Sequence, residues 1–192
     1  MDVKDKSKKL PALGFCPQFD IVYPTLTVEE HFIFFSMIKG LSYSDAREDA
    51  AQLIKDVDLE LDYHKVSTAL SGTKRIQNSK NSQIWSNFLL GGMKRRLSLG
   101  IALTGKPKVV FLDEPSSGLD PVKRRHFWTL IQKNMTDRAV LLTTHLMEEA
   151  DTLCDEIGII TTGFMRCFGN SIYLKNALSE GLKLQIVLDK QR

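Results

Sequence analysis

Hydrophobic positions in the first third of the chain predict two helices. Thr27 and Glu30 have the spacing of a capping box, in which each side chain binds the backbone amide of the other residue. The apolar run that follows predicts a helix over 31–39, ended by Gly40. Apolar residues at steps of three and four predict a second helix over about 44–57.

From residue 92 onward, the pattern alternates between strands and helices. Short continuous apolar runs at 109–112 and 139–142, with polar residues on both sides, predict buried strands of a parallel sheet. The other expected elements are helices over 92–103, from Pro121, over 147–153 and over 170–178, and strands over 157–161, 164–168 and 182–188. This alternation predicts an α/β fold with a mainly parallel sheet.

Two stretches show no such pattern. The first ten residues are polar and rich in lysine, so we interpret them as weakly ordered. Residues 66–88 contain few apolar positions and no clear period, which is unusual for a connection of this length inside a domain.

Composition narrows the class of protein. The chain has 192 residues, of which 43% are hydrophobic and 26% are charged, as in an ordinary globular domain. The net charge of +3 is too small to suggest a nucleic-acid binder, although basic residues cluster at 94–96 and 123–125, where we expect solvated helix faces. The three cysteines are widely spaced, which favours a reducing compartment over a disulfide framework.

The strongest chemical signal is a pair of acids at the end of the strand predicted at 109–112. Asp113 and Glu114 follow it directly, and the carboxyl edge of a parallel sheet faces the ligand crevice. An acid in the position of Asp113 can hold Mg²⁺, and Glu114 can polarise an attacking water. By itself such a pair also fits the start of a solvated loop.

Other fragments stand around this pair in a fixed order. They are Phe15-Cys16-Pro17-Gln18-Phe19-Asp20, Leu89-Leu90-Gly91-Gly92-Met93, Ser117-Gly118-Leu119-Asp120 and Thr143-Thr144-His145. Together with Phe111–Pro115, the set resembles the nucleotide-binding domain of ABC transporters. The four fragments resemble its Q-loop, signature motif, D-loop and switch histidine, in that order, and Phe111–Pro115 resembles its Walker B motif. The sequences CPQFD, GGMKRRLSLGIAL and THLMEEAD resemble subfamily A, the lipid-exporter branch.

The resemblance implies a P-loop NTPase-like ABC ATPase fold that binds ATP and Mg²⁺. It implies that Glu114 is the catalytic carboxylate, that His145 contacts the γ-phosphate and that Gln18 reaches Mg²⁺ and the attacking water. Asp113 would be the metal ligand of Walker B.

The resemblance also implies partners. Gly91 and Gly92 would offer amides to ATP on a second nucleotide-binding domain, and Ser117 and Asp120 would act at the interface between the two domains. The segment after Gln18 would contact the transmembrane domains, which places the domain on the cytoplasmic face of a membrane. No nucleic-acid partner is implied.

The resemblance covers about residues 10–188. It implies a helical subdomain over about 24–104 and a Walker B, D-loop and switch-histidine core over 105–188.

The sequence departs from the family at the phosphate-binding loop. No G-x-x-x-x-G-K-[ST] segment is present, and the near match at 100–107 has Pro107 in place of the hydroxyl residue, so we reject it. We therefore expect an N-terminally incomplete cassette without the Walker A strand, loop and helix, whose ATPase activity alone is poor or absent.

The signature motif is also interrupted. Leu70-Ser71 and Gly91-Gly92 would form the family motif if residues 72–90 were removed. An in-frame retained intron and a genuine insertion both explain this segment.

Two alternative functions stay open. The chain could be a non-catalytic interaction module that contributes to an ATP site of a partner cassette. It could also be a soluble ABC protein acting on ribosomes or DNA, for which the basic clusters are the only support. The transported substrate is not readable from the sequence.

Overall fold

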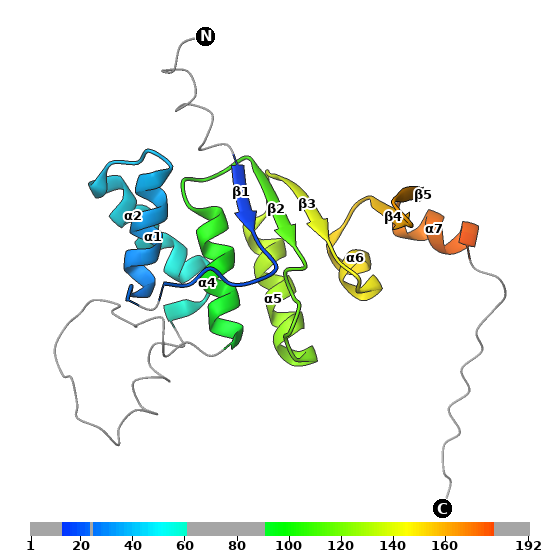
Figure 1. Cartoon of the computed structure of the whole chain (residues 1–192), viewed down its shortest axis with the longest axis horizontal. Helices are drawn as coiled ribbons and strands as arrows, with labels where there is room; N and C mark the ends of the chain where they lie inside the picture. The colour runs from blue at the N-terminus through cyan, green and yellow to red at the C-terminus, as the bar shows by residue number, and fades with distance from the viewer. Residues whose placement is uncertain (1–12, 24, 61–90, 179–192) are drawn as a thin grey trace, which may run out of the picture. The chain divides into compact units, whose positions relative to one another are not determined.

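The computed structural model describes residues 13–23, 25–60 and 91–178, in two compact units that divide between His145 and Leu146. The first unit contains β1 (Leu13–Cys16), α1 (Val28–Ile38), α2 (Tyr43–Asp56), α4 (Gly91–Leu103), β2 (Val109–Asp113), α5 (Pro121–Asn134) and β3 (Ala139–Thr143) (Figure 1). The second contains α6 (Met147–Leu153), β4 (Ile157–Thr161), β5 (Phe164–Gly169) and α7 (Ser171–Leu178). The fold is α/β, and every helix and strand predicted within these residues is confirmed.

The sheet of the first unit is parallel, with β2 between β1 and β3. Leu13 of β1 pairs with Val109, which pairs with Ala139 of β3. The sequence pattern did not predict β1, because its four residues before Pro17 are too few to show a period.

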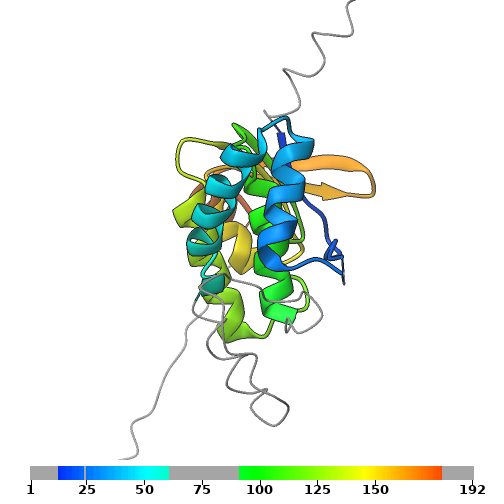
Figure 2. The ribbon, with the colours of Figure 1, turned by 90° about the vertical axis from the view of Figure 1, so that its left-hand side faces the viewer.

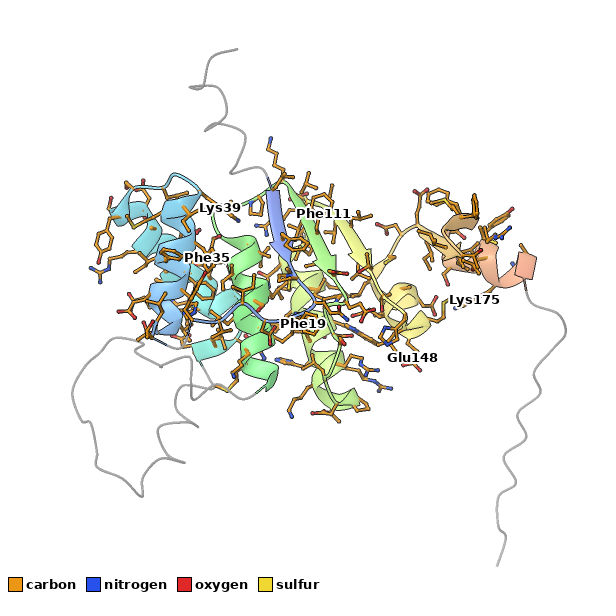
Figure 3. The ribbon with its side chains drawn as sticks, viewed as in Figure 1. Phe19, Phe35, Lys39, Phe111, Glu148 and Lys175 are labelled. Carbon is orange, nitrogen blue, oxygen red and sulfur yellow. The ribbon has the colours of Figure 1, made fainter. Side chains whose placement is uncertain are left out.

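The two faces of this sheet differ in burial. Cys16, Val110 and Leu112 are buried on one face, whereas Phe15 on the other face is 57% exposed. The prediction of a buried strand at 139–142 is wrong, because all but one of the β3 residues are exposed and Leu141 is 59% exposed. β3 is an end strand of the three described strands, and an apolar run alone does not say whether the faces of a strand are covered. Phe111 marks the middle strand in Figure 3.

Three helices pack together beside the sheet. The capping box of α1 is present, with Thr27 and Glu30 each binding the other residue's backbone amide. Helices α1, α2 and α4 contact one another, as Figure 2 shows, and α4 also contacts β1. A Cβ added to Gly100 would lie 2.5 Å from the Phe32 ring, and one added to Gly14 would lie 2.2 Å from the carbonyl oxygen of Ala102. Glycine at these two positions therefore allows α4 to lie close to both α1 and β1.

A half-buried lysine joins the ends of α1 and α4. Lys39, labelled in Figure 3, donates to the carbonyl oxygens of Ala102 at 3.3 Å and Thr104 at 2.8 Å. These are among the last carbonyls of α4 or just beyond it, which lack partners within the helix. Burial lowers the pKa of Lys39 from 10.5 to about 8, and the nearby carboxylate of Asp49 partly opposes this shift.

The segment at 100–107 does not have the setting of a phosphate-binding loop. Helix α4 ends at Leu103, and Gly105, with φ +69°, lies in the turn that leads to β2. A phosphate-binding loop lies between a strand and the helix that follows it. The structure therefore agrees with the rejection of the near match.

The second unit is a helix, a hairpin and a further helix. Strands β4 and β5 pair antiparallel, and Gly163 has the positive φ of +81° that their turn requires. Ala150, Ile157 and Leu174 form its small buried core. Asp151 of α6 accepts hydrogen bonds from Lys175 and Ser171 of α7, and the pairing lowers the pKa of Asp151.

Several expectations fall outside the described residues. They are the weakly ordered first ten residues, the stretch at 66–88, the interrupting segment 72–90 and the strand at 182–188. Within the residues that the structure describes, no helix is both long and apolar enough to cross a membrane.

Candidate functional site

The site candidates gather where the parallel strands end. The carboxyl ends of parallel strands meet at one edge of a sheet. Gln18 lies two residues after β1, Asp113 and Glu114 lie at the end of β2, and His145 lies two residues after β3. The sheet therefore brings together four residues that are widely separated in the sequence.

Glu114 lies between Gln18 and His145. The Gln18 side-chain amide donates to Glu114 Oε2 at 3.1 Å, and His145 Nδ1 lies 3.2 Å from Glu114 Oε1. The Glu114 side chain is 27% exposed and that of His145 is 64% exposed. A carboxylate held in this way stays open to a water molecule and to a ligand.

The backbone of Glu114 is strained. Its φ is +42°, in the left-handed region that favours glycine. Such a conformation persists only where the surroundings hold it, and it is common at functional sites. Here the Glu114 amide donates to the carbonyl oxygen of Thr143 at 3.0 Å, and the Glu114 carbonyl accepts from the Ser117 amide at 3.1 Å.

Thr143 is a site residue that the sequence reasoning did not assign. Its hydroxyl donates to Asp113 Oδ1 at 2.5 Å and accepts from the Glu114 amide at 3.2 Å. It therefore orients the Asp113 carboxylate and the Glu114 backbone together. The cross-strand pairing of Asp113 with Thr143 could have indicated this contact only after the register was known.

Arg95 is the second residue that the sequence reasoning missed. The prediction of a solvated face for the 94–96 cluster is wrong at this position, because the Arg95 side chain is only 3% exposed. It donates to backbone carbonyls of both loops at the site and to one carboxylate. The acceptors are the carbonyl oxygens of Pro17 (2.6 Å), Gln18 (3.1 Å), Asp113 (3.1 Å), Glu114 (3.0 Å) and Pro115, and Asp20 Oδ1 (3.2 Å).

Three of the other candidates lie near the start of α4 and the start of α5. Gly91 and Gly92 begin α4, and Asp120 caps α5 by accepting from the Lys123 amide at 3.0 Å. Lys123 also forms a 2.7 Å ion pair with Asp120, which lowers the pKa of that carboxyl group. A Cβ added to Gly92 would lie 3.2 Å from Lys123 Cδ, so the Lys123 side chain lies beside the start of α4.

Ser117 connects this region to Glu114. Its amide donates to the Glu114 carbonyl within the turn between β2 and α5. The neighbouring Ser116 hydroxyl is buried and has no hydrogen-bond partner among the described residues.

Aromatic side chains lie along the segment that follows Gln18. Tyr23 stacks on His31 and Phe35 and meets the edge of Phe34. His31 is buried and accepts from the Tyr23 amide at 2.8 Å, which fixes this segment on α1. Phe32 is in the core, whereas Phe34 is 43% exposed and Phe19, labelled with Phe35 in Figure 3, is 80% exposed.

The donor set fits a magnesium ion that is held mainly by phosphate and water. Among the described residues, no group of three or more His, Cys, Asp or Glu side chains could hold a metal ion. Mg²⁺ in phosphoryl-transfer sites needs only one or two carboxylates beside the phosphates. Asp113, oriented by Thr143, and the amide oxygen of Gln18 supply oxygen ligands of that kind.

Comparisons with known proteins give a consistent result. The sequence model of the family described as "ABC transporter" matches residues 2–117. The chain is 47% identical over 169 residues to "ABC transporter A family member 9" of Arabidopsis thaliana, which covers 88% of this chain and 16% of that protein. It is 42% identical over 184 residues to "Phospholipid-transporting ATPase ABCA3" of Mus musculus, covering 96% of this chain and 10% of that protein.

A solved structure shows the same fold. The "Structure of ATP binding subunit of ABC transporter" matches with a TM-score of 0.65 and 21% identity, covering 92% of this chain and 67% of that one. The chain thus spans a sixth or less of the length of the two relatives, and about two thirds of this subunit.

Proposed function

Because the chain belongs to the ABC transporter family and its relatives are members of subfamily A, we propose that it is part of a cassette that couples ATP hydrolysis to lipid transport. The name of the mouse relative, a phospholipid-transporting ATPase, supports lipid as the substrate class. The cassette would act on the cytoplasmic face of a membrane.

The observation that carries this proposal is the placement of Glu114. Its carboxylate lies at the carboxyl edge of a parallel sheet, with Gln18 on one side and His145 on the other. In this position Glu114 can accept a proton from an attacking water, and Gln18 can orient that water. His145 can donate to a phosphate oxygen on which charge develops.

Mg²⁺ and ATP would supply the charge and the phosphates of the reaction. Asp113 and Gln18 would hold the ion through oxygen atoms, and the Thr143 hydroxyl would keep Asp113 oriented. Gly91 and Gly92 would present backbone amides to ATP on a second cassette, with Ser117 and Asp120 at the same interface. The exposed aromatic side chains Phe19 and Phe34 suit a docking surface for the transmembrane domains.

The test is a graft into a relative. Residues 13–178 without 72–90 replace the matching part of the mouse relative, which retains its own sequence before that region. We expect Mg-ATP turnover in the chimera and its loss on Glu114→Gln, while Glu148→Gln, in the second unit, is the control and keeps turnover. A chimera that folds and does not hydrolyse ATP would contradict the proposal.

The 192-residue chain by itself should behave differently. It contains no G-x-x-x-x-G-K-[ST] segment, so it lacks the amides and the lysine that hold phosphates, and we expect negligible turnover. Turnover by the purified chain that Glu114→Gln abolishes would overturn this part of the proposal.

A second candidate function is a non-catalytic module that completes an ATP site of a partner cassette. The accessible start of α4 at Gly91 and the exposed Asp120 favour it. ATP-dependent binding of the chain to an intact cassette, lost on Gly92→Asp, would support this function.

A further inference from the structure

Two loops carry the site, and one buried side chain joins them. The Pro17–Asp20 loop presents Gln18, and the Asp113–Pro115 turn presents Glu114. Arg95 comes from α4 and donates to the backbone of both, with its side chain 3% exposed. The contacts are shared between the two loops, so neither can move without breaking bonds to the guanidinium group.

The guanidinium group is suited to this arrangement. It is planar, always charged, and presents five N–H donors in fixed directions. Nη1 faces the Gln18 loop, while Nη2 and Nε face the Glu114 turn. A lysine at this position has one nitrogen, which cannot reach both loops in the same way.

The Arg95 side chain is itself held by the carboxylate of Asp20. Asp20 Oδ1 accepts from Arg95 at 3.2 Å and from the Ser98 hydroxyl at 3.0 Å, and both donors belong to α4. The charge of Arg95 is therefore paired, which makes its burial acceptable. The pairing also fixes the Gln18 loop on the helix that begins at Gly91.

Arg95 also binds the backbone at the strained residue Glu114. The Glu114 carbonyl accepts from Arg95 Nη2, and the φ of Glu114 is +42°. A residue in this region would relax toward negative φ without surrounding contacts. Arg95 supplies contacts to the carbonyls of Asp113 and Pro115 on both sides of it as well.

We propose that Arg95 is a positioning residue that sets Gln18 against Glu114 by holding the backbones of their two loops. None of the bonds to Arg95 involves the side chain of Gln18 or Glu114, so it acts through position and not through direct contact with reactants. For ATP turnover this inference rests on the proposed function, but the placement of the two side chains can be tested without nucleotide.

The test uses nuclear magnetic resonance of the 192-residue chain. The side-chain amide of Gln18 gives a resolved ¹⁵N–¹H signal, which is assigned by its loss in Gln18→Glu. In the native chain this amide donates to Glu114, so Glu114→Gln should shift its signal. The size of that shift reports how closely the two side chains are held.

In Arg95→Lys, the shift caused by Glu114→Gln should be lost, because the loops are no longer fixed against each other. The matched control is Arg96→Lys, in the next position of the same helix. Arg96 Nη1 donates to the carbonyl of Asp58 at 3.0 Å, away from the two loops. This variant should keep the full shift.

If Arg95 served only the stability of the fold, the Gln18 signal would behave differently. Arg95→Lys would then lower the unfolding midpoint while the Gln18 signal still responded to Glu114→Gln, and this outcome would overturn the inference. If Arg95→Lys does not fold, Asp20→Ala, which removes one acceptor from Arg95, should reduce the shift, and an unchanged shift would equally overturn it.

Failure of the proposed ATPase function can be told apart from failure of the Arg95 inference. In the chimera described above, Arg95→Lys should lower the turnover number with little change in the KM for Mg-ATP. A chimera without turnover, in a chain whose Gln18 signal still depends on Arg95, would refute the ATPase function and leave the positioning role intact.

Discussion

Two parts of the first unit carry candidate site residues, and they are held in different ways. The sheet-edge cluster (Gln18, Asp113, Glu114, Thr143 and His145) is held by hydrogen bonds from buried Arg95 to its loops and by hydrogen bonds between β2 and β3. In the helix-start cluster (Gly92, Asp120 and Lys123), Asp120 caps α5 and forms an ion pair with Lys123, and the two side chains are 45% and 58% exposed; Lys123 lies beside Gly92.

This difference shows which cluster has its side chains fixed by contacts within the chain itself. Buried charge-assisted hydrogen bonds hold a geometry tightly, whereas exposed ion pairs contribute little. The sheet-edge cluster is therefore already arranged within this chain. The helix-start cluster rests on an exposed ion pair, so its side-chain arrangement is held less tightly.

The largest expected effect comes from removing Arg95. Arg95→Met should lower the free energy of unfolding by about 3 kcal/mol, because it leaves buried carbonyl groups and Asp20 without their donor. Arg96→Met, the control in the same helix, should cost less than about 1 kcal/mol. Urea unfolding followed by circular dichroism measures both, and equal losses in the two variants would show that the buried hydrogen bonds of Arg95 do not hold the sheet-edge cluster more tightly than an ordinary contact.

The next effect tests the strain at Glu114. Glu114→Gly should be more stable than Glu114→Ala by about 1 kcal/mol, because glycine adopts a positive φ without steric cost. At Ser117, which does not have a positive φ, glycine should be no better than alanine. The same unfolding measurement compares the two pairs. A more stable alanine at position 114 would show that the sheet-edge cluster stores no strain.

A smaller effect depends on pH through His31. Burial lowers the pKa of His31 below its ordinary value of 6.5, so the unfolded chain binds this proton more readily than the folded chain. The stability that neutral His31 contributes is therefore fully present above pH 6.5. It is lost as the pH falls from 6.5 through the lower pKa of the folded chain. Protonation also removes the acceptor for the Tyr23 amide.

Unfolding free energies at several pH values between 7 and 5 measure this effect. The native chain should lose stability over this range, and His31→Gln should show a flatter dependence. Parallel curves for the two proteins would show that His31 does not titrate as the structure indicates.

The smallest effect belongs to the helix-start cluster. Lys123 lowers the pKa of Asp120, so the carboxylate form is favoured on folding. This contribution is present above the ordinary pKa of 3.8 and is lost as the pH falls through the lowered value. Asp120→Asn keeps a good N-cap and removes only the charge.

Asp120→Asn should therefore be slightly less stable than the native chain at pH 7, and the two should become equal in strong acid. Thermal unfolding at both pH values measures the difference. In a Lys123→Met background the difference at pH 7 should shrink, and a difference that persists in acid would assign it to the cap instead.

Much of the fold was predictable because local patterns are strong. The capping box at Thr27, the apolar run at 109–112 and Pro121 each have a local physical reason, and the structure confirms their elements. The short strand β1 was missed because four residues show no period. The burial of β3 was predicted wrongly, because an apolar run does not say which faces are covered.

The candidate site was predictable only in part. The order of the motifs identified Gln18, Glu114 and His145, and the structure brings these three within hydrogen-bond distance, while their chemical roles stay predictions. Arg95 could not be found, because a charge in a basic run gives no sign of burial. Only the packing of α4 against β1 turns this one arginine inward and leaves its neighbours partly exposed.

The sequence by itself determined the local elements, the family resemblance and the identity of the acids at the end of β2. These follow from short-range patterns of residue type, which need no partner elsewhere in the chain. The tertiary structure alone decided that Arg95 and Thr143 serve the site and that Glu114 adopts a positive φ. These depend on the register of parallel strands and on contacts between segments far apart in the sequence, and no local pattern encodes them.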